Sequence, residues 1–301
     1  MMTTYRKTCS QLGICYFMLL FSTQIFSIVC VSAVGALAPT LLQADWFIWV
    51  SSYVPLYAVG MPMLLLLLRK MPNTVAPEKH TLPPKILLLC FVFCLGIAYL
   101  CNAISFGING ILALLKGSPI NNPVANAVSN SSFAYNLIIG CILAPVGEEF
   151  FFRKWIYRKI GQYGTLAYSL IGGLLFGMMH GNLSQLLYAF VLGAFFCVVY
   201  AKTGRIANTI ALHIGVNFVG VIGMPLLTQN NVTAMFGMAL ILALMCVASV
   251  LFVLFSHRIS YESGTQPLPP HPVRATLCNV GMGSYLLLCS LLILANIFAP
   301  T

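Results

Sequence analysis

Long apolar runs dominate this sequence and restrict the folds open to it. Stretches of roughly 20 apolar residues recur along the chain, and each is long enough to cross a bilayer as a helix. Only 7% of the 301 residues are charged, whereas soluble domains carry about a quarter. The chain is therefore predicted to be an all-α, polytopic membrane helix bundle. The expected spans are 12–38, 47–68, 86–115, 133–160, 165–180, 184–201, 206–226, 233–256 and 278–298.

The basic residues fall on alternate connections between these spans. All lysines and arginines except Lys116 follow this pattern, and by the positive-inside rule it predicts a cytoplasmic N-terminus and an external C-terminus. The net charge of +10 is thus explained by topology, and nucleic acid is not expected as a partner. The alternating residues are Arg6, Lys7, Arg69, Lys70, Lys79, Lys85, Arg153, Lys154, Arg158, Lys159, Lys202, Arg205, Arg258 and Arg274.

The polar connections are short, so we expect one integral membrane domain over residues 1–301. The first span has a second interpretation, because its basic start and its "VGALA" end are also typical of a signal peptide. Cleavage there would leave eight spans with unchanged orientation. The eleven cysteines show no C-x-x-C spacing and predict neither a disulfide framework nor a zinc knuckle. Gly173 and Gly177 form a G-x-x-x-G motif, which favours close helix packing.

The segment "APVGEEFFFRKW", residues 144–155, places two of the five acidic residues inside a predicted span. Ionisable side chains within a membrane are costly and indicate a functional site. Glu149 and Arg153 are four residues apart, so a helix places them on one face where they can form an ion pair. Glu148 points about 100° away and lacks that partner. We predict that Glu149 is neutralised while Glu148 is free for chemistry, and that Pro145 kinks the helix just upstream.

Two later spans contribute imidazoles. His180 ends "FGMMH", and "HIGVN" places His213 and Asn217 on one helical face. At 1.5 Å per residue, Glu148 is about 20 Å from the "GQYG" turn at 161–164, and His180 is about 24 Å beyond that turn. His213 and Asn217 lie about 12–18 Å into their span from the same side. These depths predict that Glu148 faces His180, and that all four side chains line one cavity open toward the cytoplasm.

The constellation supports two kinds of chemistry. A carboxylate and an imidazole can share a proton and activate water, while a second imidazole and a carboxamide stabilise an oxyanion. Alternatively, Glu148, His180 and His213 supply three ligands with one open position, the pattern of a catalytic zinc site. The residues leave both open. Each element also has a structural interpretation, since a single membrane histidine often serves only helix packing. The H-E-x-x-H, paired-aspartate and Gly-x-Ser signatures of other intramembrane proteases are absent from the sequence.

Three motifs in order, "EEFFFR" (E-E-x-x-x-R), "FGMMH" (F-x-x-x-H) and "HIGVN" (H-x-x-x-N), resemble the CPBP family. That family groups type II CAAX prenyl endopeptidases with bacterial bacteriocin-processing and self-immunity proteins. The resemblance covers about residues 134–222, the expected catalytic core. Lys154 departs from the pattern, because many relatives have glycine after the arginine.

The resemblance implies an α-helical membrane fold and an endopeptidase that acts through activated water. It leaves a metal undecided, with zinc as the candidate, and the short loops are typical of a protein of the bacterial cell membrane. In this sequence it implies Glu148 and His180 as water activators, His213 and Asn217 as oxyanion stabilisers, and Glu149 and Arg153 as a supporting pair.

The leading hypothesis from the sequence is an intramembrane endopeptidase that cleaves membrane-associated substrates, either CAAX-like proteins or peptide precursors. Buried Glu and His also suit proton relays, so a proton-coupled transporter is a second hypothesis, although the internal symmetry of many transporters is not evident. A third is a non-catalytic immunity protein that binds a peptide toxin, in which the motif residues serve only packing.

Overall fold

The computed structural model describes residues 4–74, 76–258 and 260–299, and every regular element in these ranges is helical. The other residues of the predicted 1–301 domain, and the side chain of Arg258 from the charge pattern, lie outside this description. The α-helices are α1 (Thr4–Leu37), α2 (Phe47–Pro55), α3 (Met61–Leu68), α4 (Pro84–Lys116), α5 (Pro123–Ser129), α6 (Phe133–Tyr135), α7 (Ala144–Glu149), α8 (Trp155–Ile160), α9 (Thr165–Met179), α10 (Leu183–Thr203), α11 (Ile206–Phe218), α12 (Met224–Leu227), α13 (Asn231–Phe255), α14 (Pro272–Leu277) and α15 (Val280–Phe298).

Short 3-10 and π segments join or extend these helices. They are η1 (Pro39–Gln43), η2 (Leu56–Gly60), η3 (Asn136–Leu143), η4 (Phe150–Lys154), η5 (Gly161–Tyr163), η6 (Val219–Gly223) and η7 (Ser256–Arg258).

Eight helical stretches in the described ranges are long and apolar enough to cross a membrane. One of them, Phe133–Tyr163, is continuous through η3, α7, η4 and α8. The remaining predicted span, 165–180, corresponds to α9, which has only 15 residues and is therefore about 22 Å long. The prediction of an all-α polytopic bundle is confirmed, and the chain is an integral, multi-pass membrane protein.

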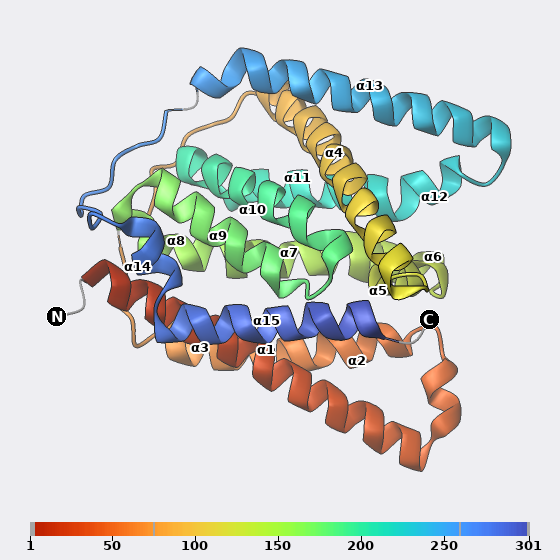
Figure 1. The fold of residues 1–301 in the computed structure, drawn as a ribbon. Coiled ribbons are helices and arrows are strands. Elements are labelled where there is room, and N and C mark those ends of the chain that lie inside the picture. The colour runs from red at the N-terminus through yellow and green to blue at the C-terminus, as the bar shows by residue number, and fades with distance from the viewer. Residues whose placement is uncertain (1–3, 75, 259, 300–301) are drawn as a thin grey trace.

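The helices form three layers (Figure 1). The middle layer contains α7, α8, α9, α10 and α11. On one side, α1 packs along α15 and along the continuous helix formed by α2, η2 and α3. On the other side, α13 crosses α4, which packs on α10. The middle layer is thus covered on both faces, so the side chains that point to its interior, such as Phe152, Leu175 and Phe196, are shielded from lipid.

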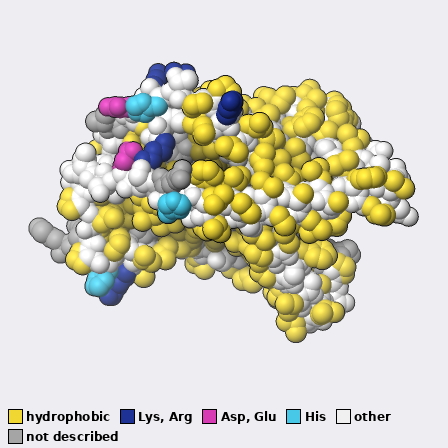
Figure 2. All heavy atoms as spheres, turned by 90° about the horizontal axis from the view of Figure 1, so that it is seen from above, with side chains coloured by type: hydrophobic (Ala, Val, Ile, Leu, Met, Phe, Trp, Pro, Cys, Tyr) yellow, Lys and Arg dark blue, Asp and Glu magenta, His cyan; other side chains and the backbone are white. Residues whose placement is uncertain are grey.

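Charged side chains gather at one end of the molecule, where the N-terminal turn of α1, the 69–83 and 256–271 connections and the α8–α9 turn meet (Figures 1 and 2). Both connections are docked there, since Lys159 Nζ donates to Met71 O at 2.9 Å and Thr165 N donates to Glu262 O at 3.0 Å. Lys116 is at the opposite end, where it donates to Ala299 O at 2.9 Å. This segregation is what the positive-inside rule requires, and the cytoplasmic placement of the N-terminus stays a prediction.

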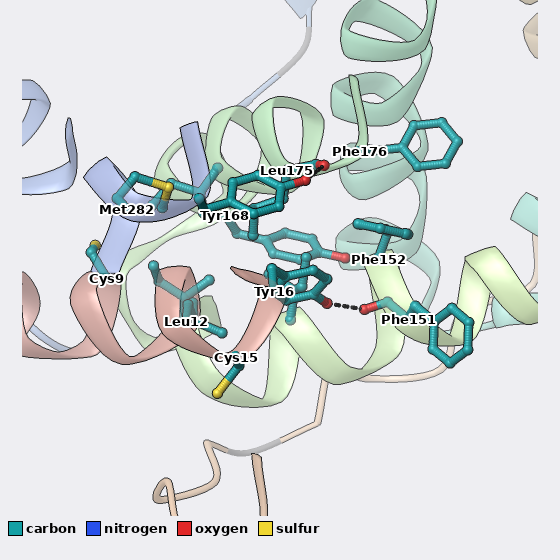
Figure 3. Close-up of a cluster of buried hydrophobic side chains, with 14 of the residues drawn as sticks. Cys9, Leu12, Cys15, Tyr16, Phe151, Phe152, Tyr168, Leu175, Phe176 and Met282 are labelled. Atoms are coloured by element: carbon teal, nitrogen blue, oxygen red, sulfur yellow. Dashed lines mark hydrogen bonds between the residues drawn. The ribbon is translucent and has the colours of Figure 1, made fainter. Parts of the chain in front are cut away.

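Three buried side chains hold the π segment that follows Glu149. A π turn leaves carbonyls without their usual α-helical donors, and within a membrane each needs another partner. Tyr16 from α1 donates to Phe151 O (Figure 3), and Tyr168 from α9 donates to Arg153 O at 3.0 Å. The Cys197 thiol from α10 lies 3.7 Å from Phe152 O. Neighbours from three helices therefore fix the backbone that carries the ionisable residues.

The helices α9 and α10 pack closely through glycines, as the G-x-x-x-G motif predicts. A Cβ added at Gly173 would lie 2.7 Å from Phe190 O, and one at Gly177 would lie 2.9 Å from Leu186 O. Only a hydrogen atom fits at these positions. This close approach brings the end of α9, with His180, against the start of α10.

Candidate active site

The span Phe133–Tyr163 places the two adjacent carboxylates between two π segments. Glu148 and Glu149 end α7, which follows η3 and precedes η4. Pro145 is the second residue of α7 and has no backbone N–H, so one helical hydrogen bond is missing where η3 meets α7. The hydrogen-bond pattern of the helix is already irregular at that point, because η3 is π-helical. π turns recur at functional sites because they rotate side chains relative to an α-helix.

Glu149 is fully buried and has two cationic or polar partners. Arg153 Nη2 lies 2.9 Å from Glu149 Oε1, the i,i+4 contact that the spacing predicts. His213 Nδ1 lies 2.8 Å from the same oxygen. The guanidinium of Arg153 is also buried and stacks on Phe176, whose ring centroid is 4.4 Å away. The cation is thereby paired and covered by an aromatic face, which makes it tolerable inside the bundle.

Glu148 has a different environment. Its carboxylate oxygen lies 3.7 Å from His213 Nε2, too long for a direct hydrogen bond, and its side chain keeps 17% exposure. Its charge also acts electrostatically on Tyr53, Tyr57 and Tyr188. The charges of Arg153 and Glu149 act on it in turn. The two neighbouring carboxylates therefore have different partners. Glu149 forms an ion pair with Arg153, whereas Glu148 faces His213 without a direct hydrogen bond to it.

His213 connects the two carboxylates. When Nδ1 carries the proton, it donates to Glu149, and Nε2 is turned toward Glu148. A carboxylate bonded to one ring nitrogen fixes the tautomer and the ring orientation, leaving the other nitrogen available. The sequence assigns this histidine to oxyanion stabilisation beside Asn217, whereas the structure makes it the nearest imidazole to Glu148.

His180 is located differently from the expectation that it faces Glu148. It caps the C-terminal end of α9, and its Nδ1 donates to Phe176 O at 2.8 Å. Among the described residues no hydrogen bond or ion pair joins His180 to Glu148. The ring of Phe176 contacts both imidazoles edge-on, with centroid distances of 4.8 Å to His180 and 5.7 Å to His213. The ring of Phe176 therefore lies against both imidazoles, and equal depth along two helices is not sufficient for contact between Glu148 and His180.

Asn217 donates from Nδ2 to Gly140 O at 3.0 Å, a carbonyl of the η3 segment. It also lines a cavity of about 980 Å³ between α4, α10, η6 and α13, which Glu148, His180 and His213 do not line. This cavity is therefore not the shared one that the sequence predicts, and a single cavity for all four side chains stays a prediction. Asn217 follows His213 by one helical turn along α11.

The candidate zinc ligands do not converge. In the described part of the chain no three His, Cys, Asp or Glu side chains lie close enough together to hold a metal ion. Glu148 and His213 are neighbours, but His180 is directed at its own helix. The donor set does not fit the three-ligand zinc site in this conformation.

Several residues of the site carried no recognisable signal in the sequence. Tyr188 and Tyr57 belong to other helices, and only the fold brings them within electrostatic range of Glu148. Thr209, fully buried one turn before His213, is a further neighbour of Glu149. Phe176 is the exception, because it is the first residue of the "FGMMH" motif, four residues before His180.

The fold and the site define a polytopic membrane protein with a carboxylate–imidazole cluster inside its middle layer. Comparison with known proteins then points to one family. Residues 130–219 match the family described as "Type II CAAX prenyl endopeptidase Rce1-like". This segment contains all three motifs, so their resemblance to the type II CAAX endopeptidases is confirmed.

The same region is similar to a "Putative membrane peptidase YdiL" from Bacillus subtilis (strain 168). The two proteins are 33% identical over 82 residues, which is 27% of this chain and 34% of the relative. The similarity therefore spans about a third of the relative's length. No solved structure matches this chain.

Proposed function

We propose that this chain is an intramembrane endopeptidase in which Glu148 activates water for attack on a peptide bond. The observation that carries the proposal is the different treatment of two adjacent carboxylates. Glu149 is bound by Arg153 and by Nδ1 of His213, whereas Glu148 faces Nε2 of His213, which has no other partner among the described residues. The family match over 130–219 and the similarity to a putative membrane peptidase support the reaction class.

The 3.7 Å between Glu148 and His213 Nε2 suits a water molecule bonded to both groups. Glu148 takes one proton from this water, and the oxygen adds to the carbonyl carbon of the substrate. The resulting oxyanion is stabilised by a hydrogen bond from Asn217, whose amide has a second hydrogen besides the one bonded to Gly140 O. His213 can also donate to the oxyanion, but only in its doubly protonated form, in which Nε2 carries a hydrogen. The proton on Glu148 then passes to the leaving nitrogen as the C–N bond breaks. Water and peptide thus give a carboxylic acid and an amine, which become a carboxylate and an ammonium group once the acid proton is transferred.

Glu149 acts on this chemistry through His213. Its hydrogen bond to Nδ1 orients the ring and favours a positive imidazole when the oxyanion forms. Arg153 balances the carboxylate, so the cluster stays near neutrality in the membrane. His180 remains a second candidate imidazole, with Nε2 not used by its bond to Phe176 O. We propose membrane-associated proteins or peptides as the substrates.

The test compares protein termini in membranes of cells that make either the native chain or Glu148→Gln at equal amounts. Glu78→Gln is the matched control, because Glu78 lies in the polar 69–83 connection with 89% exposure. We expect new termini with the native chain and with Glu78→Gln, and none with Glu148→Gln. Identical termini for the native chain and a folded Glu148→Gln variant would overturn the proposal and favour a binding protein.

A further inference from the structure

A surface hollow lies beside α14, just before the last span. It has a volume of about 490 Å³, and its lining residues in the described chain belong to one short segment. Two of them, His271 and Arg274, supply hydrogen-bond donors or positive charge, and none is acidic. The hollow therefore combines cationic side chains with an otherwise apolar wall. The lining residues are Pro270, His271, Pro272, Val273, Arg274, Leu277 and Cys278.

A third basic side chain reaches this hollow from α1. Arg6 Nη2 donates to Cys278 O at 2.7 Å, and Cys278 is one of the lining residues. Among the described residues, no carboxylate forms an ion pair with Arg274 or His271. Glu262, in the connection that leads to α14, is 2.7 Å from Lys202 Nζ instead. The charge of the hollow is thus complementary to an anion from outside the chain.

The wall of the hollow is fixed by contacts with α1 and by the turn into α15. The hydroxyl groups of Tyr5 and Thr276 are 2.7 Å apart and buried. Asn279 Nδ2 donates to Thr276 O at 2.7 Å, and Asn279 Oδ1 accepts from Met282 N at 2.9 Å. Thr276 is therefore buried against α1, while Arg274 stays exposed. A ligand would meet a site that is already formed, which lowers the entropic cost of binding.

The length of α15 sets the depth of the hollow in the membrane. Its 19 residues extend about 28 Å, close to the thickness of the hydrocarbon core of about 30 Å. Only two residues separate α14 from α15, so α14 lies at the level of the lipid headgroups, at the charged end of the bundle (Figure 1). Val273 and Val280 are 69% and 79% exposed. Exposed apolar side chains next to basic ones, at this depth, fit a phospholipid better than a soluble anion.

We propose that this hollow binds the phosphate group of an anionic phospholipid between His271 and Arg274. The guanidinium of Arg274 and the imidazole N–H of His271 donate to the phosphate oxygens. The acyl chains lie along the exposed face of α15, where Leu287 and Leu291 follow Val280 by about two and three turns. This lipid site does not depend on the proposed function, because none of the candidate active-site residues lines the hollow.

Photolabelling of the full chain in phosphatidylcholine nanodiscs tests the site. Two probes carry a diazirine at the same position near the start of one acyl chain, and they differ only in a phosphatidylglycerol or a phosphatidylcholine headgroup. We expect the phosphatidylglycerol probe to label residues 270–280 at least about 5-fold more than the other probe, the preference expected for one basic side chain near an anionic headgroup. Equal labelling by both probes would overturn the inference.

Inorganic phosphate distinguishes the source of the anion. Added in excess, it should leave the labelling by the phosphatidylglycerol probe unchanged, because it lacks the acyl chains that contact α15. Loss of labelling on addition of phosphate would show a site for a soluble anion and overturn the lipid assignment. A photo-cross-link through residues 270–280 to a second copy of the chain, in place of lipid adducts, would show a protein interface there and also overturn it.

Arg274→Gln should lower labelling by the phosphatidylglycerol probe about 5-fold. Arg69→Gln is the matched control, because Arg69 is an exposed arginine that directly follows α3 and does not line the hollow. We expect less than about a 2-fold loss for Arg69→Gln and for the charge-conserving Arg274→Lys. Equal losses for Arg274→Gln and Arg69→Gln would mean a general attraction to the basic end of the bundle and contradict a defined site.

Labelling is compared per folded molecule, with folding checked by size-exclusion chromatography of each variant. His271→Gln gives a second measurement that holds if Arg274→Gln does not fold. The expected loss for His271→Gln is about 2-fold to 5-fold, the size typical of one hydrogen bond to a charged group or less. Unchanged labelling in a folded His271→Gln variant, together with unchanged labelling in Arg274→Gln or its failure to fold, would overturn the inference.

Discussion

The span Phe133–Tyr163 and the helix α13 are both long and apolar, but they have opposite surroundings. In their most apolar 18-residue windows, 50% of the residues of the first are buried inside the protein, against 6% for α13. The first carries Glu148, Glu149 and Arg153, and α13 carries no charged residue. The difference shows that ionisable side chains occur in this membrane protein where other helices exclude lipid. Hydrophobicity alone does not distinguish a buried span that carries a site from a span that faces lipid.

The largest effect is expected from breaking the buried ion pair. Either Glu149→Gln or Arg153→Met leaves one uncompensated charge in the middle layer, which should cost about 3–5 kcal/mol of stability. The measurement is thermal or denaturant unfolding in nanodiscs. The double variant Glu149→Gln/Arg153→Met should recover part of the loss, because no unpaired charge remains. Losses of stability below about 1 kcal/mol for both single variants would contradict a stabilising role of the Glu149–Arg153 ion pair.

A second prediction concerns the packing of the middle layer. Gly173→Leu forces a side chain toward the backbone of α10 and should destabilise the protein by about 2–3 kcal/mol. Gly107→Leu is the control, because a Cβ there meets no atom within 4 Å. Unfolding of the two variants under the same conditions checks this. Equal stability would show that α9 and α10 can separate without loss.

A smaller effect is expected at the π segment. Tyr168→Phe leaves the buried carbonyl of Arg153 without its donor and should cost about 1–2 kcal/mol. The exposed Tyr261→Phe serves as the control. Because the substitution also relaxes the backbone beside Glu149, cleavage per folded molecule should fall with it. A stable but fully active Tyr168→Phe variant would argue against a role for this contact in the site.

The smallest effect is expected on α13. Val253 is 71% exposed on a helix with few protein neighbours, so Val253→Ala should change stability by less than about 0.5 kcal/mol. The same unfolding measurement applies. A larger loss would mean that this face of α13 packs on another protein rather than on lipid, and would weaken the contrast between the two spans.

Much of the fold could be predicted from the sequence because membrane helices are encoded locally, by the length of an apolar run and the charges that flank it. The Glu149–Arg153 contact could also be predicted, since it depends only on helical spacing. Partners on different helices could not. Depth along the membrane suggested that Glu148 meets His180, but Phe176 fills the space beside His180 and α11 turns His213 toward Glu148 instead.

The π segments explain the remaining difference. Helical spacing assumes 3.6 residues per turn, and each π turn changes the direction of the residues that follow it. Nothing in "EEFFFR" predicts that Phe150–Lys154 is π-helical, or that Tyr16, Tyr168 and Cys197 supply the missing partners. The cavity beside Asn217 was likewise invisible, because its walls come from helices far apart in the sequence.

The central claim is that Glu148 handles water while Glu149 holds the cluster together. The most direct test is the cleavage rate per folded molecule of Glu148→Gln, measured on the substrate that the termini identify. Loss of a general base predicts a rate at least about 100-fold below that of the native chain, with unchanged stability. A folded Glu148→Gln variant that cleaves within about 3-fold of the native rate would contradict the account, because general-base catalysis typically contributes 100-fold or more.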